Sequence, residues 1–179
     1  MIGAGYTLSK DGIEIKYSIE NKDDKDLPFG FGVHPYFRKL SGEKDTLITI
    51  PAQYVMDYTS DLLPTGRLID LADTIYEIRN ETEIGALDLD HVFTGIEKGK
   101  YAEIKYNSLG MKIELHTSED FTHLVLYSPA GKDYFCIENQ TCFTDAHNLC
   151  ERGFKAQSGL KFVSSGNTFS GTVKYGGIS

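Results

Sequence analysis

The chain has 179 residues and a mass of 20.0 kDa, with 40% hydrophobic residues, 25% charged residues and a formal net charge of -8. This composition fits one folded domain and argues against disorder, and no apolar run approaches the roughly 18 residues that cross a bilayer. The negative charge disfavours nucleic acid and anionic membranes as partners. The first residues lack the basic and apolar parts of a signal peptide, so we expect a cytoplasmic protein.

Alternation of apolar and polar residues is the main signal along the chain, and it predicts strands. The predicted strands cover residues 13–20, 27–34, 46–50, 101–106, 111–115, 123–127, 134–137 and 169–175. Turn residues between 106 and 111 predict a hairpin there. Residues 67–80 have apolar residues at helical spacing, so a short amphipathic helix and an irregular segment both stay open. Many short strands with frequent turns predict an all-β protein, either a sandwich or a barrel.

The three cysteines lie close together at Cys136, Cys142 and Cys150. An odd count without a CxxC pair argues against a disulfide framework and against a thiolate zinc site. We therefore expect free thiols that are buried or half-buried.

A histidine ends the predicted strand at 27–34. With a period of two, the apolar residues of 29–33 fall on one face, and Gly30, Gly32 and His34 fall on the other. Glycines weaken a strand, and close approach by a ligand is one reason to accept that cost. A histidine at this place is a candidate acid or base. The alternative is a bulged strand whose histidine forms a hydrogen bond to the core.

Glu138 closes a predicted strand whose other residues are apolar. Desolvation at the edge of such a strand raises the pKa of a carboxyl group toward the range in which it can accept and return a proton. The alternative is a glutamate at the rim of the core that binds a backbone amide or an arginine.

A pair of aspartates lies at Asp88 and Asp90. If residues 87–93 are extended, both share a face and His91 points the other way. Paired carboxylates suit a divalent cation or the hydroxyl groups of a sugar, whereas a turn with solvated aspartates is the alternative. The five histidines form no HxH or HxxxH pair, so we predict no metal site.

Six short segments, in order along nearly the whole chain, resemble the aldose 1-epimerases, also called mutarotases or galactose mutarotase-like proteins. They are Asn21, Gly30-Phe-Gly-Val-His-Pro-Tyr-Phe37, Pro64-Thr-Gly66, Leu89-Asp-His-Val-Phe93, Cys136-Ile-Glu138 and Asp145-Ala-His-Asn148. Each segment is a weak signal alone, but the ordered set is specific.

The resemblance implies a large antiparallel β-sandwich, the galactose mutarotase-like supersandwich, as one domain over residues 1–179. It also implies interconversion of the α and β anomers of a free hexose, without a cofactor. In the family's pattern, His34 corresponds to the general acid that protonates the ring oxygen. Glu138 corresponds to the general base that takes the proton from the C1 hydroxyl, and Asp90 to the residue that holds substrate hydroxyls.

Family members carry a longer segment before the strand that begins here near Tyr6, with an arginine and a second histidine that bind the sugar. The resemblance therefore implies that the domain is truncated at its N-terminus. Strands left without neighbours would expose apolar edges, so we expect a homo-oligomer formed through those edges. Three functions stay open: an epimerase, a carbohydrate-binding sandwich with little or no activity, and a self-associating structural domain. A glycosidase would need two acids at the bond, such as Asp90 and Glu138.

Overall fold

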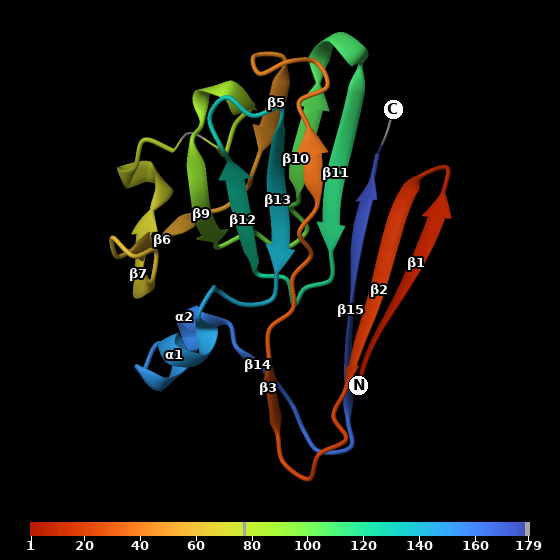
Figure 1. The fold of residues 1–179 in the computed structure, drawn as a ribbon, viewed down its shortest axis with the longest axis vertical. Coiled ribbons are helices and arrows are strands. Elements are labelled where there is room, and N and C mark those ends of the chain that lie inside the picture. Colours follow the sequence, from red (N-terminus) through yellow and green to blue (C-terminus); the bar gives the residue numbers. More distant parts are fainter. Residues whose placement is uncertain (77, 178–179) are drawn as a thin grey trace.

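The structure is a computed structural model that describes residues 1–76 and 78–177, and it consists mainly of antiparallel sheets (Figure 1). The larger sheet has the order β1 (Ile2–Ser9), β2 (Gly12–Glu20), β15 (Thr168–Gly176), β11 (Met111–Thr117), β10 (Ala102–Tyr106), β5 (Thr46–Thr49) and β8 (Thr82–Glu83). The second sheet has the order β4 (Tyr36–Arg38), β13 (Tyr134–Gln140), β12 (His123–Ser128), β9 (Leu89–Thr94), β6 (Tyr54–Tyr58) and β7 (Pro64–Asp70).

Smaller elements complete the described part of the chain. A two-stranded sheet joins β3 (Leu27–Phe29) to β14 (Lys161–Val163). Two short helices, α1 (Ala146–Glu151) and α2 (Lys155–Ser158), follow β13. Three 3-10 turns cover Leu71–Asp73, Ile84–Ala86 and Asn107–Leu109. None of the described helices has the length and apolar character needed to span a membrane.

The two large sheets pack face to face, and the main core lies between them. Ile48 and Ile104 from the seven-stranded sheet meet Phe93, Leu124 and Ile137 from the six-stranded sheet, and all five are almost completely buried. Because side chains alternate along a strand, the residues between these core positions point to the outer face of each sheet. The all-β sandwich predicted from the sequence is confirmed.

Part of the outer face of the six-stranded sheet is covered. Met56, Val92 and Val125 on this face pack with Phe143 and with Leu149 of α1. Helix α1 therefore packs through Leu149 on the outer face of β6, β9 and β12. Figure 1 shows α1 and α2 together below the six-stranded sheet.

Most of the predicted strands are present within a residue or two of their expected ends, including the hairpin of β10 and β11. The predicted strand at 27–34 is too long, because β3 ends at Phe29 and His34 lies outside any strand. No α-helix forms in the described part of 67–80, where β7 runs to Asp70 and a 3-10 turn follows. Residue 77 in that range lies outside the described residues. The β6, β7 and β14 strands were not predicted, and β1 begins at Ile2, earlier than the strand expected to begin near Tyr6.

The β1 strand forms one edge of the seven-stranded sheet and carries exposed apolar side chains. Among the described residues it pairs with β2 alone. Ile2, Tyr6 and Leu8 are 71%, 73% and 80% exposed, and β1 contains no charged residue. Natural edge strands commonly carry charges or prolines that discourage pairing with another chain, and this one does not.

His123 on β12 gives folding stability a defined pH dependence. Its ring is buried, lies edge-on to Phe143 at 4.2 Å between centroids, and has Nδ1 2.8 Å from Thr122 Oγ1. Burial lowers the pKa of His123 from 6.5 to about 4. Between these two values the unfolded chain binds a proton that the folded chain does not bind. The free energy of unfolding should therefore fall by up to ~3 kcal/mol as the pH drops through this window.

The test is urea unfolding between pH 4 and 7 for the His123→Leu variant. We expect the free energy of unfolding of this variant to vary less steeply with pH than that of the wild type. The reason is that leucine binds no proton in the unfolded chain. His147→Leu on the exposed side of α1 is the matched control and should keep the wild-type slope. An unchanged slope in His123→Leu would contradict this assignment.

Candidate active site

The loop that carries His34 is held beside β13 by backbone hydrogen bonds. Phe31 N–H donates to Thr141 Oγ1 at 2.9 Å, and Thr141 N–H donates to Phe31 O at 2.8 Å. Val33 N–H then donates to Asn139 O at 3.2 Å. These bonds continue the sheet for a few residues beyond β4, so His34 follows a segment that is already aligned with β13.

Pro35 interrupts this pairing immediately after His34. Proline has no backbone N–H, so the ladder cannot continue through it, and regular pairing with β13 resumes only at Tyr36, which lies opposite Cys136. The His34 ring stacks on the Tyr36 ring, with 4.9 Å between centroids and 16° between planes. The side chain is otherwise open, at 53% exposed, so it is oriented on one side and accessible on the other.

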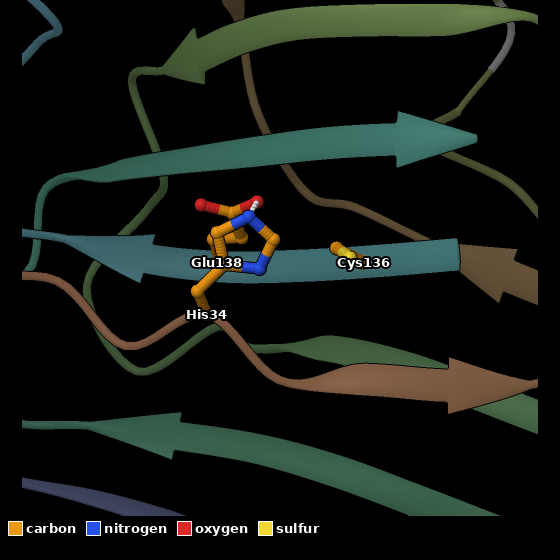
Figure 2. Close-up of side chains that lie close together, drawn as sticks. All are labelled: His34, Cys136 and Glu138. Carbon is orange, nitrogen blue, oxygen red and sulfur yellow. Dashed lines mark ion pairs between the residues drawn. The ribbon is translucent and has the colours of Figure 1, made fainter. Parts of the chain in front are cut away.

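Glu138 meets His34 from the neighbouring strand. Its side chain leaves β13 on the outer face and is only 8% exposed, and its Oε1 lies 3.0 Å from His34 Nε2 (Figure 2). Gln140 Nε2 donates to the other carboxylate oxygen at 3.3 Å. Both oxygens of this buried carboxylate therefore have a partner, as a buried charged group requires.

The surroundings of Glu138 raise the pKa of its carboxyl group. Burial is the largest cause, and the negative charge of Asp90 adds to it. His34 and the hydrogen bond from Gln140 act in the opposite direction because they stabilise the ionised form. The net direction is upward, which suits a group that accepts and returns a proton.

Asp90 lies on the same outer face but forms no hydrogen bond or ion pair with His34 or Glu138. In the sheet register, Asp90 of β9 lies opposite Tyr127 of β12, and Tyr127 lies opposite Cys136 of β13. Two strand spacings place Asp90 about 10 Å from Cys136 across the sheet. Asp90 is exposed, and its charge still affects the pKa of Glu138.

The two aspartates predicted as a pair have separate surroundings. Asp88 accepts a hydrogen bond from Ala130 N–H at 3.2 Å. His91 points to the opposite side of β9 from Asp90, as predicted, and its Nε2 lies 3.3 Å from Tyr76 Oη. Burial lowers the pKa of His91, and its ring packs against Tyr76 and Phe93.

A pocket of about 490 Å³ opens beside the His34–Glu138 pair, within the size range of small-molecule sites. It is lined by the loop of Gly30 to His34, by Glu138 and Gln140, and by residues 142–147 at the start of α1. Close approach by a ligand, given above as a reason for glycine at positions 30 and 32, is not the whole reason. A Cβ at Gly30 would collide with Cys142 Sγ, and one at Gly32 would lie 2.9 Å from Gln140 Cγ. These glycines make room for the chain's own side chains.

Cys136 is the third reactive side chain of this cluster. It lies two residues before Glu138 on the same outer face of β13, is completely buried, and carries a free thiol, as Cys142 and Cys150 do. Burial, followed by the charges of Glu138 and Asp90, raises the pKa of the Cys136 thiol to about 12. Ligand atoms of His34, Cys136 and Glu138 all lie within 4.8 Å of one another, so these residues could hold a metal ion.

Sequence reasoning missed three contributors to this cluster. Gln140 and Cys136 share the outer face of β13 with Glu138, so the period of two along 136–140 could have indicated both. The stacking of Tyr36 on His34 had no comparable signal, because it depends on how the chain passes Pro35 between its two paired segments.

Comparison with known proteins gives a consistent result. A family model described as aldose 1-epimerase matches residues 3–176. No curated protein sequence matches the chain. Among solved structures, a galactose mutarotase-like protein from Clostridium acetobutylicum superposes with a TM-score of 0.84 at 23% identity, over 98% of this chain and 55% of that one.

Two further structures show the same fold. The Slr1438 protein from Synechocystis sp. PCC 6803 gives a TM-score of 0.75 at 27% identity, over 98% of this chain and 53% of that one. A GalM/aldose epimerase homologue from C. elegans gives 0.79 at 16% identity, over 99% of this chain and 59% of that one. The chain thus spans between 53% and 59% of the length of these three relatives.

The hydrogen bond from Gln140 gives a test of what controls the pKa of Glu138. Replacing Gln140 with Met keeps the length of the side chain but removes the donor, so the pKa of Glu138 should rise further. The measurement is a carbon-13 NMR titration of the Glu138 carboxyl carbon, assigned by its loss in Glu138→Gln. Gln53→Met at an exposed site is the control and should leave the titration unchanged. A Glu138 pKa that stays constant or falls in Gln140→Met would contradict the electrostatic account.

Proposed function

Because this chain belongs to the aldose 1-epimerase family, we propose that it interconverts the α and β anomers of a free hexose by acid–base ring opening and closure. The observation that carries the proposal is the 3.0 Å contact between His34 Nε2 and Glu138 Oε1 at the edge of a pocket. Two groups that can exchange protons stand together where a small polar molecule can reach them.

Each proton in the proposed reaction has a defined donor and acceptor. Glu138 takes the proton of the C1 hydroxyl, and the electrons of that O–H bond form the carbonyl bond at C1. The bond from C1 to the ring oxygen breaks, and the ring oxygen takes a proton from His34. Rotation about C1–C2 turns the other face of the aldehyde toward the ring-forming hydroxyl. The ring then closes as His34 regains its proton and Glu138 returns its own to the carbonyl oxygen, so no cofactor is consumed.

The two residues differ in how freely they can adjust to a sugar. Glu138 is buried and bound by Gln140, whereas His34 is half-exposed and is held mainly by stacking on Tyr36. The substrate must enter between groups that now touch, so His34 is the partner that moves. Asp90, about 10 Å across the same face, would bind hydroxyls at the far end of the sugar.

A carbohydrate-binding sandwich with little or no turnover is the second candidate. The observation that favours it is the contact between His34 and Glu138, because at 3.0 Å it leaves no room for a sugar between the two groups. Self-association and cytoplasmic location stay predictions. The uncharged edge strand β1, with its exposed Ile2, Tyr6 and Leu8, supports the first of these.

Polarimetry of freshly dissolved α-D-glucose and α-D-galactose tests the proposed activity. We expect the chain to accelerate mutarotation and Glu138→Gln to lose roughly 10²–10⁴-fold of that acceleration, because the variant cannot accept the C1 proton. Glu119→Gln, which removes an exposed carboxylate that pairs with Lys98, is the control and should remain active.

If the wild-type chain does not outpace buffer, the catalytic proposal is wrong. Calorimetric titration with the same sugars then separates the two remaining functions. Heat of binding would favour the carbohydrate-binding sandwich, and its absence would favour a structural domain.

The role of Asp90 has its own test. Asp90→Asn removes a charged hydrogen-bond acceptor for sugar hydroxyls, so KM should rise roughly tenfold or more while kcat changes less. Asp88→Asn changes a carboxylate that lies just before β9, and it should leave KM near the wild-type value. Equal effects of the two substitutions on KM would show that Asp90 has no specific contact with the sugar.

A further inference from the structure

Three potential metal ligands converge on the outer face of the six-stranded sheet. Cys136 and Glu138 are two residues apart on β13, so they project from the same face, and His34 reaches over them from the adjacent loop (Figure 2). His34 Nε2, Cys136 Sγ and an oxygen of Glu138 lie within 4.8 Å of one another. Within residues 1–76 and 78–177, no other group of three such ligands comes this close together.

We propose that His34, Cys136 and Glu138 form a binding site for a single thiophilic divalent cation of the Zn²⁺ type. Zinc binds imidazole nitrogen, thiolate sulfur and carboxylate oxygen in tetrahedral geometry, with bonds of about 2.0–2.3 Å. That geometry places neighbouring ligand atoms ~3.3–3.8 Å apart. The ligand atoms of His34, Cys136 and Glu138, now within 4.8 Å of one another, reach this range after shifts of about 1 Å.

The surroundings favour such a cation in two ways. The site offers nitrogen, sulfur and oxygen donors, unlike the all-oxygen shells that Ca²⁺ and Mg²⁺ take. Asp90 and Glu138 also place negative charge around Cys136, which attracts a cation to the same place. Gln140 orients the Glu138 carboxylate and Tyr36 orients the His34 ring, so both ligands have the outer support that metal sites commonly show.

The site would have an open fourth position. The pocket of about 490 Å³ borders His34 and Glu138, so water can complete the tetrahedron from that side. Binding displaces the Cys136 thiol proton, and any proton shared by His34 and Glu138, into solvent. No atom changes oxidation state.

Occupancy would inhibit the proposed epimerase, because the cation uses the lone pairs that His34 and Glu138 need for proton transfer. This consequence rests on the proposed function, but the binding itself does not. Zinc would therefore act as a reversible inhibitor competing with the sugar for the acid–base pair.

Titration of the full chain with Co²⁺, followed by displacement with Zn²⁺, tests the site directly. We expect one equivalent of Co²⁺ to produce a thiolate-to-metal charge-transfer band in the near ultraviolet, and Zn²⁺ to abolish it. Cys136→Ser should lose the band and weaken Zn²⁺ binding by at least the ~10–100-fold that loss of a supporting partner costs. Cys142→Ser, which alters a thiol that lines the neighbouring pocket, should keep both.

A second variant covers the case in which Cys136→Ser does not fold, since that residue is buried. His34→Gln replaces a half-exposed side chain and should fold while weakening Zn²⁺ binding to a similar extent. Absence of the band in the wild type, its persistence in Cys136→Ser, or its loss in Cys142→Ser would each overturn the proposal. None of these measurements depends on enzyme turnover. A chain that binds Co²⁺ but does not accelerate mutarotation would therefore contradict the proposed epimerase activity and support the metal site.

Discussion

The contact between His34 and Glu138 depends on one constraint, the alignment of the segment around residues 31–38 with β13. Backbone hydrogen bonds from Val33 to Asn139 and the pairing of Tyr36 with Cys136 fix this segment on both sides of Pro35. His34 is carried in the short gap between them. A slip of one residue in this register would turn its side chain to the other face, away from Glu138.

The same strand connects the site to the core of the sandwich. Phe135 and Ile137 of β13 are completely buried between the sheets, and Cys136 and Glu138 alternate with them on the outer face. The position of the carboxylate is therefore set by the packing of its neighbours. Leu149 of helix α1 packs on the adjoining part of this face against Val92 and Val125, and residues 142–147 at the start of α1 line the pocket beside Glu138. Burial of Glu138 at this place is the largest cause of its raised pKa.

The sequence predicted what depends on local periodicity and missed what depends on register between strands. Alternation was sufficient for β2 and β15, whereas β13 was expected as a short apolar strand closed by Glu138 and continues to Gln140. The helical spacing at 67–80 was misleading, because those apolar residues include Leu68 on β7 and Leu71 in a 3-10 turn, each packed against sheet residues. The glycines beside His34 indicated space, but only the fold shows that Cys142 and Gln140 take part of it. Likewise, the spacing of histidines along the sequence could not reveal the group of His34, Cys136 and Glu138, because His34 comes from a different segment than the other two.

A double-mutant cycle on mutarotation tests most directly whether His34 and Glu138 act as one unit. The kcat/KM values of His34→Gln, Glu138→Gln and the double variant would be compared with that of the wild type. Because ring opening needs both proton transfers, the account predicts that the double variant is about as slow as the slower single variant. If the two losses multiply, each residue acts independently, and the contact between them is not the basis of catalysis.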